Sequence, residues 1–167
     1  MADKLKVVIT DNQKVVKVQT GIRMLLRRCC HAILENDNYE GSAEIGIIFT
    51  DNAQMRELCR QHFGCETEKD YIALSSEKSD SSIQGEAEPA VSYLGDVCIS
   101  FERAVEAAAK SNRPIGRQMV TLTAMGVLEL LGYTPEKSDD DDELRQRVEL
   151  VLFQLGFPVS SSYYISK

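Results

Sequence analysis

The chain has 167 residues, of which 43% are hydrophobic, and its formal net charge is −7. This length and composition suit a real core, so we expect residues 1–167 to form one domain. The acidic balance argues against nucleic-acid binding by overall charge, and any RNA contact must therefore come from a local basic site. The five cysteines form no regular framework, and we see neither a leader nor a membrane-length apolar run. We expect a cytoplasmic protein with reduced thiols and no membrane partner.

The first part of the chain alternates strands and helices. Period-two alternation predicts a half-buried strand at residues 4–11, and β-branched residues predict a buried strand at 43–50. Between them, helical spacing at 20–35 predicts an amphipathic helix with a basic outer face. Asp51 and Gln54 form a capping-box pattern, which predicts that the next helix begins there.

That helix is expected to end at Gly64, and two strands follow it. We expect them at residues 70–75 and 93–99, separated by a flexible polar loop at about 76–92. Ser100 is the expected cap of a further helix of about ten residues.

The most apolar long run of the chain spans residues 117–135. Its apolar positions cover more than one helical face, which predicts a core helix enclosed by its neighbours and ended by Gly132. A last helix is expected at about 141–155, with the acidic run 139–143 placed at the positive end of its dipole. Strands first and helices last favour an α+β fold, in which a single-layer mixed sheet of about four strands packs against about five helices.

Several strings in this order carry a resemblance to a known family. They read LGDVCIS at 94–100, FERA at 101–104 and GVLELLGY at 126–133, and the segment 45–64 matches in place and order. Together they resemble the YbeY family of rRNA-maturation proteins, from about residue 43 to 157. The resemblance implies a YbeY-like fold and a zinc-dependent endoribonuclease, a hydrolase that acts in rRNA maturation and ribosome quality control.

The zinc of that family is held by three histidines in the pattern H-G-x-L-H-L-x-G-Y-D-H. Two imidazoles one helical turn apart and a third from the following turn leave a coordination position for an activated water. By the resemblance, the ligand positions fall here on Met125, Glu129 and Pro135. A thioether, one carboxylate and a proline do not make a zinc site, so we expect no zinc and a lost metal centre. The family also has an arginine in its L-N-x-x-Y-R-G segment. By the resemblance, that position is occupied here by Phe63, which removes a candidate phosphate contact.

Carboxylates and thiols elsewhere offer weaker alternatives. If an altered site still holds an ion, the candidate catalytic residues are Glu129, Asp70 and Asp96. A second possible metal site consists of residues spaced three apart near one helix end, namely Cys59, His62 and Cys65. A fourth ligand is not evident there, and Cys59 and His62 fit the inward stripe of that helix equally well.

A basic stripe on the helix at 20–35 is the candidate surface for RNA or a protein partner. It consists of Arg23, Arg27 and Arg28, and Arg113 and Arg117 extend it if the two helices are adjacent. The alternative is ordinary solvent-exposed helix charge.

These observations favour a metal-free YbeY-like protein that binds rRNA, the small ribosomal subunit or a ribosome-associated protein. The first alternative is an active metal-dependent endoribonuclease with an altered site. The second is a protein-interaction module with no RNA role, in which the acidic charge selects basic partners.

Overall fold

The computed structural model describes residues 2–76, 91–133 and 138–157. The strands in chain order are β1 (Ala2–Asp11), β2 (Gly41–Thr50), β3 (Tyr71–Ser75) and β4 (Ser92–Ser100). The helices are α1 (Ile22–Asn36), α2 (Asn52–Phe63), α3 (Phe101–Ser111), α4 (Ile115–Leu130) and α5 (Ser138–Gln154). The expected α+β class is confirmed. Most of the loop expected at 76–92 lies outside the described residues. Pro135 also lies outside them.

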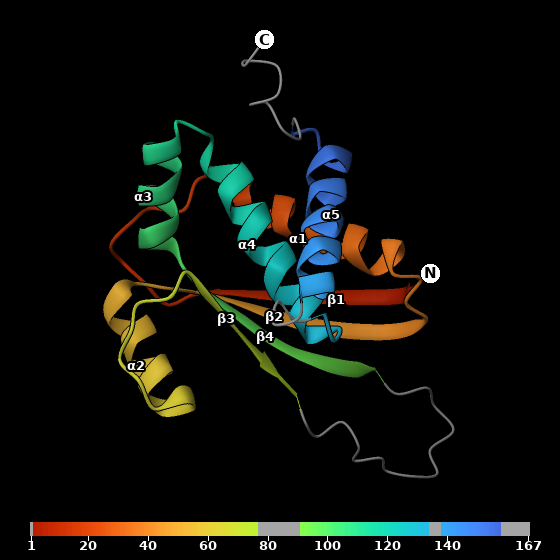
Figure 1. The fold of residues 1–167 in the computed structure, drawn as a ribbon, viewed down its shortest axis with the longest axis horizontal. Coiled ribbons are helices and arrows are strands. Elements are labelled where there is room, and N and C mark those ends of the chain that lie inside the picture. The colour runs from red at the N-terminus through yellow and green to blue at the C-terminus, as the bar shows by residue number, and fades with distance from the viewer. Residues whose placement is uncertain (1, 77–90, 134–137, 158–167) are drawn as a thin grey trace.

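The four strands form one mixed sheet in the order β1-β2-β4-β3 (Figure 1). β1, β2 and β4 are parallel, and β3 runs antiparallel to β4 at the edge. In this register Ile9 lies beside Ile47, which lies beside Val97, so the apolar positions of neighbouring strands share one face.

The two faces of the sheet are covered unequally. On one face, Ile47 and Val97 are fully buried in the main core, which α1, α4 and α5 complete. On the other face, Cys98 and Ile72 pack against α2 in a smaller cluster. Figure 1 shows α2 on one side of the sheet and α1, α4 and α5 on the other. The single layer of strands therefore carries helices on both sides.

The central helix is α4, as its apolar pattern predicts. It packs against α1, α3, α5 and the two strands β3 and β4. Gly126 allows its closest approach to the sheet, because a Cβ there would lie 2.4 Å from Val97 Cγ1. The helix ends at Leu130, and Gly132 follows with a φ of 105°.

Local capping signals in the sequence also place both ends of α2 and the start of α3 correctly. The Asp51 side chain accepts from the backbone N–H of Gln54 at 2.8 Å, which confirms the capping box. Gly64 ends α2 in a left-handed conformation, and Ser100 caps α3 through the N–H of Arg103. α5 begins at Ser138 rather than near residue 141, so the acidic run lies in its first turns.

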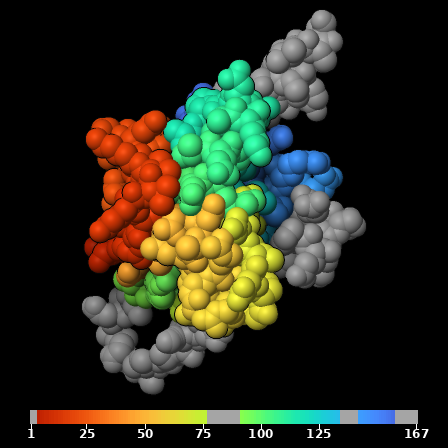
Figure 2. All heavy atoms as spheres, turned by 90° about the vertical axis from the view of Figure 1, so that its left-hand side faces the viewer, coloured from red at the N-terminus to blue at the C-terminus, as the bar shows by residue number. Residues whose placement is uncertain are grey.

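The carboxyl ends of the three parallel strands meet at one end of the molecule. There Ser100 Oγ donates to Asn52 Oδ1 at 3.0 Å, and the Asn52 N–H donates to Glu102 Oε1 at 3.0 Å. Figure 2 looks onto this end, where the red segment after β1 lies beside α2 in orange and α3 in green. These hydrogen bonds tie the starts of α2 and α3 together.

Among the helices within the described ranges, none combines the length and the apolarity that a bilayer crossing requires.

Thr123 gives a first testable prediction about the core. Its side chain on α4 is fully buried, and Oγ1 has no hydrogen-bond partner among the described residues. Because valine keeps the shape and removes the unpaired hydroxyl, we expect Thr123→Val to raise the free energy of unfolding by about 1 kcal/mol. Urea unfolding measures the change. The matched control is Thr121→Val, which removes the 2.9 Å bond from Thr121 Oγ1 to Arg117 O, so equal stabilisation by both would contradict the argument.

Candidate functional site

A pocket of about 560 Å³ lies at the β3 edge of the sheet. The end of α2, the beginning of α3, β3 and one residue of α4 surround it. Its polar and charged lining residues are Lys69, Asp70, Tyr71, Arg103 and Glu129, and the aromatic ring of Phe63 completes the wall. Two of the three candidate catalytic carboxylates, Asp70 and Glu129, therefore share one pocket.

Glu129 is held in this pocket by a strand residue. The Tyr71 hydroxyl donates to Glu129 Oε2, joining β3 to α4. Burial, and then this carboxylate acceptor, raise the pKa of Tyr71 above its usual range, so the phenol stays protonated at neutral pH. One oxygen of the Glu129 carboxylate is thus already occupied as an acceptor.

Asp70 belongs to an ion-pair network that includes two residues of the pocket, Asp70 and Arg103, and two outside it. Arg103 Nε donates to Asp70 Oδ1 at 2.7 Å, and Arg103 also lies 3.8 Å from Glu68. Arg56 of α2 pairs with the same Glu68. The hydrogen bond to Asp70 raises the pKa of Arg103, so the guanidinium remains fully charged. This network links α2 and α3 through the segment that leads into β3.

Asp96 lies on the other face of the sheet. Val97 packs against Gly126 of α4, so the preceding side chain on the strand points away from α4. Asp96 lies directly over Gly46, where an added Cβ would lie 2.1 Å from Oδ1, and it accepts from the Tyr93 hydroxyl. Asp96 therefore does not join Asp70 and Glu129.

The donor set at the three family ligand positions does not fit a zinc ion. Met125 lines a separate groove of about 390 Å³ between α4 and α5. Glu129 is bonded to Tyr71, and Pro135 lies outside the described residues and has no side-chain donor. In the described ranges no group of three or more His, Cys, Asp or Glu residues is placed to hold a metal. A thioether and one carboxylate are not the ligands of a catalytic zinc.

The second possible metal set is dispersed as well. Cys59 is fully buried beside Met55 and Cys98, whereas His62 and Cys65 are exposed. The assignment of His62 to the inward stripe was wrong, because α2 buries only Met55 and Cys59 against the sheet.

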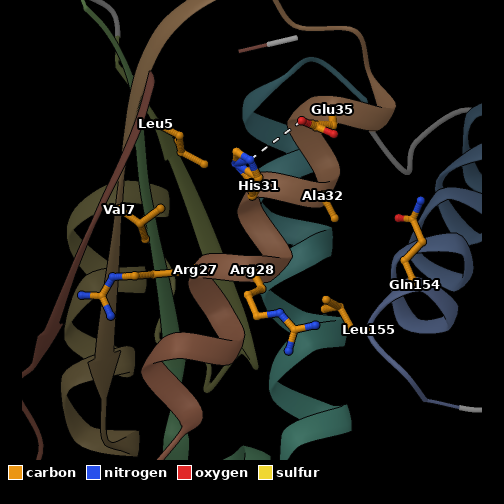
Figure 3. Close-up of a pocket in the computed structure, with 9 residues that line it drawn as sticks. All are labelled: Leu5, Val7, Arg27, Arg28, His31, Ala32, Glu35, Gln154 and Leu155. Carbon is orange, nitrogen blue, oxygen red and sulfur yellow. Dashed lines mark ion pairs between the residues drawn. The ribbon is translucent and has the colours of Figure 1, made fainter. Parts of the chain in front are cut away.

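The predicted basic stripe divides between two places. Arg27 and Arg28 line a pocket of about 470 Å³ between α1, β1 and the end of α5 (Figure 3). Arg113 and Arg117 line the groove between α4 and α5, where desolvation and then repulsion from Arg113 lower the pKa of Arg117. Arg23 is exposed and lines neither.

These arginines share one electrostatic property. Within the described ranges, no carboxylate forms an ion pair with Arg23, Arg27, Arg28, Arg113 or Arg117. By contrast, Arg56, Arg60, Arg103, Arg145 and Arg147 are all paired. The arginines singled out from the sequence are therefore the ones whose charge remains available to an anionic partner.

Sequence reasoning missed two residues of the β3 pocket. Tyr71 follows Asp70 in a short strand, and nothing local indicates that its hydroxyl reaches a helix 58 residues further on. Arg103 lies within the FERA string, which serves as a family signature, and its pairing with Asp70 spans 33 residues.

Comparisons with known proteins agree on one family. The family model described as Endoribonuclease YbeY matches residues 8–156. A protein named Endoribonuclease YbeY from Desulforamulus reducens is 30% identical over 152 residues, which is 91% of this chain and 98% of that relative. One of the same name from Roseiflexus castenholzii is 32% identical over 133 residues, covering 79% of this chain and 82% of the relative.

A solved structure supports the fold independently. The solution structure of a Thermotoga maritima protein matches with a TM-score of 0.55 at 17% identity and covers 89% of this chain and 90% of that one. At this identity the match speaks for the fold alone.

Proposed function

This chain belongs to the YbeY family, and we propose that it is a metal-free member that acts in rRNA maturation by binding rather than by zinc-dependent cleavage. Its partner in this proposal is rRNA, the small ribosomal subunit or a ribosome-associated protein. In this proposal the pocket with Asp70 and Glu129, which contains one of the three family ligand positions, contacts a polar ligand, and the unpaired arginines supply the binding charge.

The observation that carries the proposal is the set of contacts that Glu129 makes. It is the one position of the three that retains a hard metal donor, and its carboxylate accepts from the Tyr71 hydroxyl. Coordination through the other oxygen, Oε1, would leave this hydrogen bond in place, but it would find no imidazole one turn earlier, because Met125 stands there. The pocket thus supports contact with a polar ligand better than activation of a metal-bound water.

The charge distribution supports the binding half of the proposal. The chain is acidic overall, with a net charge of −7, so diffuse attraction to a polyanion is unfavourable. Unpaired guanidiniums gathered at specific places overcome this locally, because arginine matches phosphate geometry and remains charged. Binding of this kind weakens steeply with salt.

Zinc content and RNA cleavage together test the proposal. We expect the purified protein, equilibrated with zinc and desalted, to retain far less than one equivalent, while a family member that keeps the three histidines retains about one. We also expect structured rRNA fragments to bind in low salt and to remain uncut with Zn²⁺, Mn²⁺ or Mg²⁺. About one equivalent of zinc that disappears in Glu129→Ala would overturn the metal-free assignment.

One observation favours the alternative of an altered, still active hydrolase. Asp70 and Glu129 share their pocket with the cations Lys69 and Arg103, a combination that can position a phosphodiester. Metal-stimulated cleavage of structured RNA that is abolished by Glu129→Ala would establish this alternative. Absence of RNA binding even at low salt would instead favour a protein-interaction module.

A further inference from the structure

The pocket that contains Arg27 and Arg28 lies at the opposite edge of the sheet from the Glu129 pocket. β1 forms one edge strand and β3 the other. In Figure 3, α1 forms the back of the pocket, Leu5 and Val7 of β1 stand on one side, and Gln154 at the end of α5 stands on the other with Leu155, which follows it. The volume of about 470 Å³ falls within the range of pockets that bind small molecules.

Apolar and cationic groups are segregated within this pocket. Leu5, Val7, Ala32 and Leu155 are half-buried and give it apolar walls. At one end Arg27 extends toward β1 and Arg28 toward Leu155, so their guanidiniums point away from each other on the two sides of α1 (Figure 3). Both side chains are exposed, and neither is paired with a carboxylate in the part of the chain that the structure describes.

The other end of the pocket is polar and is lined by His31, Glu35 and Gln154. His31 Nε2 lies 3.8 Å from Glu35 Oε2. Beyond them, Asn36 and Gln154 exchange side-chain hydrogen bonds of 2.9 and 3.1 Å, which fasten the end of α1 to α5. The pocket therefore offers two cations at one end, apolar walls in the middle, and neutral or acidic hydrogen-bonding groups at the other end.

This order of groups restricts the ligand. Inorganic phosphate would satisfy the arginines and leave the apolar walls unused, whereas an apolar ligand would leave the guanidiniums without a partner. A duplex presents its phosphates outward and keeps its bases stacked, so it cannot fill a hollow with a base. A nucleotide of a single strand offers an anionic phosphate next to a planar, mainly apolar base with polar edges, in the same order as the pocket.

We propose that this pocket binds one unstacked nucleotide of single-stranded RNA, with the phosphates on its two sides at Arg27 and Arg28 and its base against Leu5, Val7 and Leu155. The inference rests on the proposed RNA-binding function and identifies the kind of RNA and the place of contact. His31 and Glu35 then lie at the base edge, where hydrogen bonding allows a preference among bases.

The test uses fluorescence anisotropy of the full chain with a labelled single-stranded RNA and with the same sequence as a duplex. Since a charge-assisted contact contributes about 1.5–3 kcal/mol, Arg27→Ala/Arg28→Ala should weaken single-strand binding at least tenfold. The slope of log K against log salt should become shallower by about 1.4 units for two lost phosphate contacts. The control Arg60→Ala/Lys110→Ala removes the same charge from exposed positions on α2 and α3 and should have little effect.

A second variant tests the contribution of the pocket's volume independently of its charge. Ala32→Phe fills the hollow without altering any charge and should weaken single-strand binding about tenfold, with Ala32→Leu giving a smaller loss and circular dichroism checking the fold. A nucleoside monophosphate should compete with the RNA, and inorganic phosphate at equal concentration should not.

The outcomes distinguish a failure of the nucleotide pocket from a failure of the proposed function. Single-strand binding that survives both the Arg27→Ala/Arg28→Ala change and Ala32→Phe overturns the nucleotide pocket and leaves the proposed function in place. Tighter binding of the duplex, or displacement of RNA by a poly-glutamate peptide with greater affinity, likewise overturns the nucleotide assignment. Failure of the wild type to bind any RNA at low salt overturns the RNA-binding form of the proposed function, and this inference with it.

Discussion

Alanine at position 126 is expected to lower the free energy of unfolding by about 1–3 kcal/mol, although alanine normally favours a helix over glycine by about 1 kcal/mol. An added Cβ would lie 2.4 Å from Val97 Cγ1 and 2.9 Å from Val97 Cγ2. Val97 is fully buried in the middle of β4, so its branched side chain has no space into which it can turn. Either α4 moves away from the sheet or the strand is deformed, and both changes disturb close packing.

Urea unfolding of a double-mutant cycle tests this steric account. Val97→Ala alone leaves a cavity, and adding Gly126→Ala to it supplies a methyl group where the valine methyls were. We therefore expect the second substitution to cost little or to stabilise in the Val97→Ala background, with a coupling energy of about 1 kcal/mol or more. If Gly126→Ala stabilises the protein by about 1 kcal/mol when Val97 is present, as helix propensity alone would predict, the close contact is contradicted.

Truncation of Phe101 to alanine should lower the free energy of unfolding by about 3–5 kcal/mol. Phe101 is the first residue of α3 and is 1% exposed. Its ring meets Phe49 of β2 edge to face, with centroids 5.1 Å apart. Removing it leaves a cavity between the helix and the sheet, because the backbone at the start of α3 is held by the Ser100 cap.

Thermal or urea unfolding measures the loss, and Phe101→Leu gives a milder variant if the alanine form does not fold. The matched control is Phe153→Ala on α5, whose side chain is 67% exposed and which should change stability by no more than about 0.5 kcal/mol. Similar losses at both positions would show that the Phe101 ring is not an anchor of the core.

The features that the sequence predicted well are those encoded within a few residues. The α2 start follows from Asp51 and Gln54, which interact across a single turn, and the α3 start follows from Ser100 in the same way. The enclosure of α4 follows from its own apolar pattern. The starts of α1 and α5 were less well placed, because α1 begins after a left-handed glycine, Gly21, and carries no side-chain cap.

The candidate site was predictable only where a family string marked it. Glu129 was identified through the GVLELLGY string, and its pocket contains Asp70, which was also named. Tyr71 was missed because its role depends on a contact between a strand and a distant helix. The division of the basic stripe was equally hidden, since adjacent residues Arg27 and Arg28 acquire a common pocket only when β1 and the end of α5 approach α1.

The placement of the two pockets at opposite edges of the sheet has an evolutionary consequence. Strands in a sheet are about 4.8 Å apart, so about 14 Å separates β1 from β3, which exceeds the Debye length of roughly 8 Å at physiological salt. A change of charge beside Glu129, even one as large as the loss of a dication, is largely screened from Arg27 and Arg28. Under the proposed function, such a protein can lose cleavage activity at the β3 edge without a loss of RNA affinity at the β1 edge. Selection can therefore act on the residues of each pocket independently.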